Sequence, residues 1–259
     1  MKEIILQKGR NILEDVGDYA VFFQGFIRNI FTDGFERDEL LRQCYLLGVK
    51  SIYIVLITGF ILGFVLTLQS QPTLKAFGAE SYVPNMVAIS IIREIGPVII
   101  SLICAGKIAS GIGAELGSMK VTDQIAAMDV SAANPVQYLV VPRILACTIM
   151  VPLLVLFADS MSLLGGFLGV NVSGSMTGTL YFNKSFASLV FSDFFPALIK
   201  TFLFGFIIGF VGCYKGFHAN RGTESVGIAA NSAVVSASVW IILIDALAVQ
   251  LTSLLVYNS

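Results

Sequence analysis

Charged side chains inside otherwise apolar stretches are the residues of this chain that could carry chemistry. They are Arg93, Glu94, Asp159, Lys200 and Asp245. Each would cost roughly 2.5–3.5 kcal/mol on a membrane-insertion scale if it faced lipid. We therefore expect most of them to face a protein interior or a water-filled cavity. They could line a polar transport cavity or form a buried ion network that locks helices together, and the two interpretations are compatible.

The partners of Arg93 and Glu94 are expected on other helices. Neighbouring residues on a helix point about 100° apart, so the two side chains reach in different directions, and Lys200 and Asp245 are the candidate partners. Gly96 and Pro97 follow after one intervening residue, Ile95. Because proline has no N–H, the carbonyl of Arg93 loses its helical partner, which predicts a kink beside the charged pair. A bare carbonyl of this kind is tolerated only against protein or water.

The composition predicts an integral membrane protein. Of the 259 residues, 56% are hydrophobic and 13% are charged, whereas a soluble domain has about 25% charged residues. The net charge of −1 gives no indication of a nucleic-acid partner. The four cysteines and the single histidine have no disulfide-like or metal-ligand spacing, so neither a bound metal nor a cofactor is expected. The charged N-terminus does not resemble a cleavable signal peptide.

The expected fold is an all-α membrane protein with about five transmembrane helices. Residues 1–45 form an N-terminal helical segment, and residues 46–259 form a single transmembrane domain. The predicted spans are 46–72, 83–106, 139–172, 188–214 and 226–257. At 1.5 Å per residue the third span measures about 50 Å; we expect one tilted helix, although a break near Leu164-Gly165-Gly166 is the alternative. Gly59-x-x-x-Gly63 allows close helix approach and is weak support for a dimer face.

The N-terminal segment has one apolar helical face interrupted by charges. This favours a helix that lies in the membrane interface, and the alternative is an amphipathic helix packed on the protein's own cytoplasmic surface. Its apolar residues are Ile12, Val16, Tyr19, Phe23, Phe26, Ile27 and Ile30.

The distribution of Lys and Arg predicts the orientation. With five spans, eleven basic residues fall on the N-terminal side, and only Lys75 and Lys184 fall on the other side. The positive-inside rule then places the N-terminus in the cytoplasm and the C-terminus outside. The eleven are Lys2, Lys8, Arg10, Arg28, Arg37, Arg42, Lys107, Lys120, Arg143, Lys215 and Arg221.

Residues 114–128, on the predicted cytoplasmic side, read as a short helix. Leu116, Met119 and Met128 offer an apolar side, and Glu115 and Lys120 are expected to be exposed. The segment could dock a partner or be a solvated loop helix, and the pattern favours neither. No GxxxxGK[ST] motif is present, so the chain is not expected to bind ATP through a P-loop.

A series of motifs over residues 93–143 resembles the MlaE (YrbE) permease family, the membrane subunits of ABC transporters that work with MCE proteins on lipids. Length, five-span layout and the amphipathic N-terminus also match the family. One departure is Lys107, where family members usually have arginine. The motifs are Arg93-Glu94-Ile95-Gly96-Pro97-Val98, Ala105-Gly106, Ala114-Glu115-Leu116-Gly117-Ser118-Met119, Gln124-Ile125, Ala127-Met128, Asn134-Pro135 and Pro142-Arg143.

The resemblance implies a homodimer in the bacterial inner membrane, with a cytoplasmic ABC ATPase and a periplasmic hexameric MCE protein as partners. ATP would be hydrolysed in the ATPase, so the chain itself is not expected to be an enzyme. Phospholipid would occupy a cavity at the dimer interface, where Arg93 and Lys200 could meet the headgroup beside Glu94 and Asp245. Its transport would maintain outer-membrane lipid asymmetry. ATPase coupling would involve Glu115, Leu116, Gly117, Met119, Gln124 and Met128.

Two other functions compete with this expectation. In a non-transporting membrane scaffold, the intramembrane charges would only stabilise helix packing. In an ion-coupled secondary transporter, Glu94 or Asp245 would be a proton site. Dependence of transport on a partner ATPase separates the favoured function from both.

Overall fold

Five long helices dominate the computed structural model, which describes residues 17–30, 36–172, 176–220 and 222–254. All regular structure in these ranges is helical, and five helices are long and apolar enough to cross a membrane. The predicted all-α membrane fold with five spans is confirmed. Ile12, Val16, the end of the predicted fifth span and Lys2, Lys8, Arg10 and Arg221 of the charge count lie outside the described residues. The five helices cover Arg37–Ala76, Glu80–Val121, Val136–Asn171, Phe191–Phe217 and Thr223–Thr252.

The first long helix, α2 (Arg37–Ala76), exceeds the predicted span at both ends. Residues 37–45, assigned from the sequence to the N-terminal segment, belong to it, and Pro72, the last residue of the predicted span, lies inside its last turns. A proline there removes a single hydrogen bond, to the carbonyl of Leu68, at a point where the helix is about to end. Forty residues measure about 60 Å, so α2 extends well beyond a hydrocarbon core of about 30 Å.

The second long helix is built from several segments and continues past the predicted span. It runs through Lys107, the first residue after the predicted span 83–106, and ends at Val121. Two π-helical turns interrupt its α-helical hydrogen bonding. Its parts are a 3₁₀ turn at Glu80–Tyr82, α3 (Val83–Ser90), a π turn η2 (Ile91–Ile95), α4 (Gly96–Cys104), a π turn η3 (Ala105–Ala109) and α5 (Ser110–Val121).

The third long helix is α7 (Val141–Asn171), preceded by a π turn at Val136–Val140. It is unbroken at Gly165-Gly166, as the preferred prediction had it. These glycines serve packing instead: a Cβ on Gly165 would lie 2.0 Å from the carbonyl oxygen of Phe60 on α2. Since α7 packs along both α2 and α9 (Phe191–Phe217), it is the central helix of the molecule.

The GxxxG pattern of α2 joins two helices of the same chain. A Cβ on Gly59 would lie 2.4 Å from the carbonyl oxygen of Ala158 on α7, and one on Gly63 would lie 1.8 Å from that of Ser162. The Ser162 hydroxyl also donates a 2.7 Å hydrogen bond to the Gly59 carbonyl. The suggestion that this pattern forms a dimer face is therefore wrong, because α7 of the same chain occupies it.

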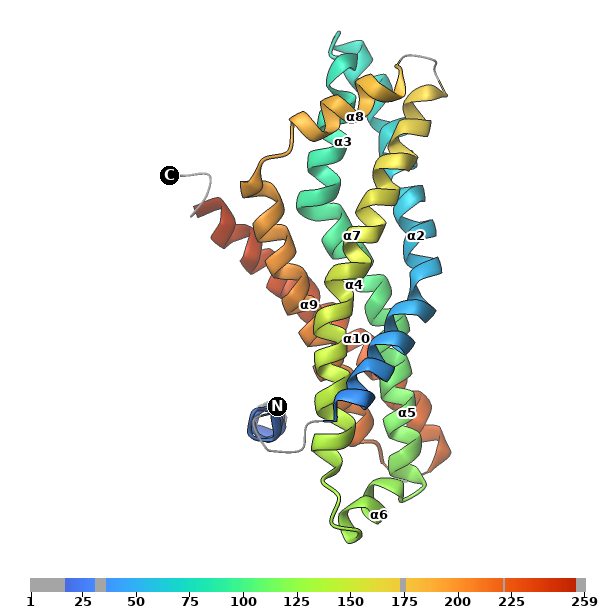
Figure 1. Cartoon of the computed structure of the whole chain (residues 1–259), viewed down its shortest axis with the longest axis vertical. Coiled ribbons are helices and arrows are strands. Elements are labelled where there is room, and N and C mark those ends of the chain that lie inside the picture. The colour runs from blue at the N-terminus through green and yellow to red at the C-terminus, as the bar shows by residue number, and fades with distance from the viewer. Residues whose placement is uncertain (1–16, 31–35, 173–175, 221, 255–259) are drawn as a thin grey trace, which may run out of the picture.

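Shorter helices close the two ends of the molecule (Figure 1). One end carries α8 (Gly178–Ala187), which packs on α3, and the other carries α6 (Gln124–Val130). Residues 17–30 form a helix that lies across the long axis and is seen end-on in Figure 1. Its Phe22 and Phe26 are buried against aromatic side chains of α9, such as Phe206 and Phe210. This helix therefore packs on its own chain while leaving Val21 and Ile27 exposed.

Candidate functional site

The charged pair Arg93–Glu94 lies within the π turn η2, directly before Gly96-Pro97. The N–H of Gly96 donates to the carbonyl of Ile91, five residues back, which is the π-helical pattern. Pro97 has no N–H for the carbonyl of Arg93. The irregularity that proline predicts thus takes the form of a widened turn, a feature that often occurs at functional sites.

Lys200 on α9 connects two carboxylates from different helices. Its ammonium group lies 2.6 Å from Glu94 Oε2 and 3.0 Å from Asp245 Oδ1 on α10 (Thr223–Thr252). The lysine side chain is 7% exposed, whereas Asp245 is 16% and Glu94 39% exposed. The expectation that the second-span charges find partners in Lys200 and Asp245 is therefore met for Glu94.

Arg93 pairs with a residue that is absent from the predicted set, Asp193 in the first turn of α9. Asp193 and Lys200 are seven residues apart, or two helical turns, so they lie on the same face of α9. Asp193 is buried. An acidic residue in the first turn of a helix is ordinarily exposed to solvent and stabilised by the helix dipole, so the position of Asp193 alone does not indicate burial. Its spacing from Lys200 was the one sequence signal that could have identified it.

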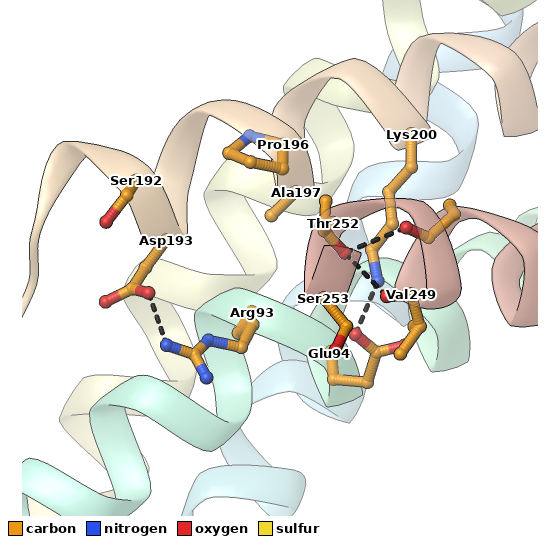
Figure 2. A pocket seen from close by; sticks show the side chains of 11 residues that line it. Arg93, Glu94, Ser192, Asp193, Pro196, Ala197, Lys200, Val249, Thr252 and Ser253 are labelled. Atoms are coloured by element: carbon orange, nitrogen blue, oxygen red, sulfur yellow. Dashed lines mark hydrogen bonds and ion pairs between the residues drawn. The ribbon is translucent and has the colours of Figure 1, made fainter. Parts of the chain in front are cut away.

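A cavity with an empty volume of about 620 Å³, which we call the charged cavity, opens over these ion pairs. Arg93 and Glu94 line it from η2, Asp193 and Lys200 from α9, and Thr252 from α10. Figure 2 shows Arg93 pointing toward Asp193, and Lys200 reaching toward Glu94. Counting Arg93 and Lys200 against Glu94, Asp193 and Asp245, the cluster carries two positive and three negative formal charges, a net −1. The cations are held by carboxylates that an anionic ligand would have to replace.

Asp159 on α7 does not join this cluster. Its Oδ1 is buried and accepts no hydrogen bond from the described residues, and it lines a separate small cavity with Pro97 and Thr201. A Cβ on Gly96 would lie 1.9 Å from this oxygen. Gly96 is therefore needed for α7 to approach the π turn. Asp159 is not among the residues that line the charged cavity.

The residues predicted to couple to an ATPase fall on two helices instead of one. Glu115, Leu116, Gly117 and Met119 lie at the end of α5, and Gln124 and Met128 lie on α6. Asp123, in a left-handed conformation, separates the two helices. The single helix expected over 114–128 is therefore wrong, because a backbone reversal interrupts it.

Burial divides these predicted coupling residues. Leu116 and Gly117 are buried, and a Cβ on Gly117 would contact Ala219 and Ala229, so they hold the chain's own helices together. Gln124 is exposed, and Glu115, with a 53% exposed side chain, pairs with buried Arg143 at 2.9 Å.

Comparisons with known proteins cover nearly the whole chain. A family model described as "Permease MlaE" matches residues 40–251, from within α2 to within α10. A probable ABC transporter permease protein of Rickettsia typhi is 36% identical over 238 residues, 92% of each chain. A similarly named protein of Synechocystis sp. is 30% identical over 84% of this chain and 86% of its own. Another, of Pyropia yezoensis, is 32% identical over 83% of this chain and 82% of its own. The matched stretch therefore reaches into all five long helices.

Proposed function

Because the chain belongs to the MlaE permease family, we propose that this ABC transporter permease moves phospholipids between a bacterial inner membrane and a periplasmic MCE protein. Such transport would maintain the lipid asymmetry of the outer membrane. ATP would be bound and hydrolysed by a separate cytoplasmic ATPase, and the permease would use that energy through conformational change.

The charged cavity is the observation that carries the proposal. A phospholipid needs a polar site for its headgroup next to apolar surface for its chains. The cavity combines Arg93 and Lys200 with apolar residues such as Ala248 and Val249 of α10. Arg93, 41% exposed, can offer its guanidinium to a phosphate as it does to the Asp193 carboxylate, since arginine binds oxygen anions of both kinds.

Large apolar surfaces on α10 and α2 support a homodimer with lipid between the copies. In the most apolar window of α10 only 17% of residues are buried, and in that of α2 only 28%. The buried residues of α10 form a single stripe, Ala229, Ala233, Ala237 and Ile241. The remaining faces are available to a second copy or to acyl chains, and that of α10 lies on the helix whose Asp245 pairs with Lys200.

The tip formed by α6 supports docking of the ATPase on the cytoplasmic side. Val130 at the end of this helix is 89% exposed, so it can offer an apolar side chain to a docked partner. The excess of Lys and Arg on this side favours its cytoplasmic location, which would leave the C-terminus in the periplasm. Because α5 is continuous with the helix that carries Arg93, movement of α5 and α6 would reach the cavity directly.

Purification in mild detergent from the native host, with mass spectrometry of what co-purifies, tests the proposal. We expect an ABC ATPase, an MCE protein and phospholipid to accompany the tagged chain. A chain that carries no ATPase and no lipid, although its native partners are expressed, would refute the proposal and leave the scaffold and ion-coupled alternatives.

A further inference from the structure

A second cavity lies between α2 and the part of the second long helix formed by η3 and α5. It is open to solvent on one side, and its empty volume, with that open space included, is about 580 Å³. Lys50 of α2 and Lys107 of the π turn η3 both line it, together with apolar residues that include Leu46 and Ile112. It shares no lining residue with the charged cavity around Arg93.

The two lysines lie at the same boundary of the apolar layer. Residues 51–74 of α2 carry no charge and begin directly after Lys50. Residues 95–106 of the second long helix carry none either, and Lys107 follows them directly. Because each lysine marks the end of an uncharged stretch on the side proposed as cytoplasmic, both ammonium groups lie at the level of the lipid headgroups.

The charges in this cavity favour an anion. The third charged residue that lines it, Glu115, is engaged by Arg143 at 2.9 Å, and Gln43 donates to Glu39 at 2.7 Å. Neither lysine forms an ion pair with a carboxylate in the described part of the chain. Lys50 and Lys107 therefore carry two positive charges against one carboxylate that already has a partner.

The backbone around Lys107 also resembles the backbone around Arg93 in the charged cavity. Arg93 and Lys107 each lie within a π turn of the same helix, 14 residues and thus about 21 Å apart along its axis. Gly111 also lines the cavity, and a Cβ on it would meet no atom within 4 Å, so the cavity is open beside this glycine. Two cations at one depth, beside Leu46 and Ile112, match the phosphate and glycerol region of a phospholipid.

We propose that Lys50 and Lys107 form a second headgroup site, which binds the phosphate of a phospholipid in the adjacent leaflet. The inference deepens the proposed function, on which it rests for the identity of the cargo. The site would hold a lipid about one leaflet away from the charged cavity, where it enters or leaves the transport path. Diacyl lipid and free phosphate share the anionic chemistry, and the apolar walls favour the lipid.

Photo-crosslinking of the full-length protein in lipid nanodiscs tests this site. The probe is phosphatidylglycerol with a photoreactive group near its headgroup, and labelled peptides are mapped by mass spectrometry. We expect labelling around residues 46–51 and 107–112. In Lys50→Gln/Lys107→Gln, the affinity at this site should fall about 25-fold, about fivefold for each lysine. Lys75→Gln, at the opposite end of α2, should label as the unmodified protein does.

Further variants and lipids keep the inference open to refutation. Lys50→Arg/Lys107→Arg should retain labelling, and thermal unfolding should show that both double variants are folded. Unchanged labelling in the glutamine variant would overturn the site, as would equal labelling by a phosphate-free diacylglycerol probe. Full competition by inorganic phosphate would instead assign it to the free ion.

The labelling needs neither ATP nor a partner, so the two proposals can fail separately. Intact labelling at this site without ATP-driven transport would reject the proposed function only. Intact transport without labelling would reject the second headgroup site only.

Discussion

Replacing Lys200 by methionine should destabilise the protein and leave two carboxylates without their cation. Lys200 contacts Glu94 at 2.6 Å and Asp245 at 3.0 Å, and its side chain is 7% exposed. Removing one member of a buried ion pair costs about 3–5 kcal/mol. Because Glu94 is 39% exposed and can be partly hydrated, we expect a value near the lower end, about 3 kcal/mol.

Removing all three charges should restore most of the lost stability. In Glu94→Gln/Lys200→Met/Asp245→Asn no ionised group of this triad remains buried. Replacing a complete buried ion network by hydrophobic side chains of similar volume is often neutral or stabilising, and a neutral amide costs much less to bury than an unpaired carboxylate. The triple variant should therefore be more stable than Lys200→Met alone, which a sum of independent losses cannot explain.

Thermal unfolding in detergent measures both effects. For a chain of this size, a loss of about 3 kcal/mol corresponds to a decrease in Tm of about 6–12 °C. Lys75→Met, which removes an exposed lysine at the end of α2, is the matched control and should unfold within about 2 °C of the unmodified protein. Lys200→Met as stable as this control, or a triple variant less stable than Lys200→Met, would refute the reasoning.

Two further predictions concern packing and the cytoplasmic end. Gly63→Ala places a Cβ 1.8 Å from the Ser162 carbonyl oxygen, so it should lower the unfolding free energy by about 1–3 kcal/mol. Gly227→Ala, the control with open space around its Cβ, should be neutral or stabilising. Equal melting temperatures of the two variants would contradict the α2–α7 packing. Arg143→Met removes hydrogen bonds to the carbonyl of Leu139 and to Glu115 and should cost about 2–3 kcal/mol in thermal unfolding. Glu115→Gln should cost less than about 1 kcal/mol because this carboxylate is largely solvated, and the reverse order would be evidence against the described burial of Arg143.

The sequence was sufficient to predict the spans and part of the charged site. Long uncharged runs can only be buried in lipid or protein, so the five helices follow from composition and length. Lys200 and Asp245 could be proposed as partners because an intramembrane charge needs an opposite one. Asp193 could not be distinguished in the same way, because a helix start near the membrane surface explains an acidic residue without burial.

Other features depend on tertiary contacts that periodicity does not contain. The spacing of Gly59 and Gly63 indicates close helix packing but does not say which helix approaches, and the partner is α7 of the same chain. The break at Asp123 between α5 and α6 arises from a left-handed backbone conformation, which aspartate tolerates better than most residues. Asp159 was expected to face protein or water because it is a charged residue inside an apolar stretch. In the described part of the chain it packs against Gly96, which has no side chain, and its Oδ1 has no hydrogen-bond partner.

ATP-dependent transfer of a labelled phospholipid, in proteoliposomes that hold the permease with its native ATPase and MCE protein, tests whether the charged cavity carries the lipid. The Glu94→Gln/Lys200→Met/Asp245→Asn variant should fold and assemble with its partners. It should nevertheless transfer lipid at least about tenfold more slowly, because a charge-assisted contact to the headgroup contributes at least that much. Transfer by this variant at the unmodified rate would show that the charged cavity does not handle the lipid, and would contradict the account.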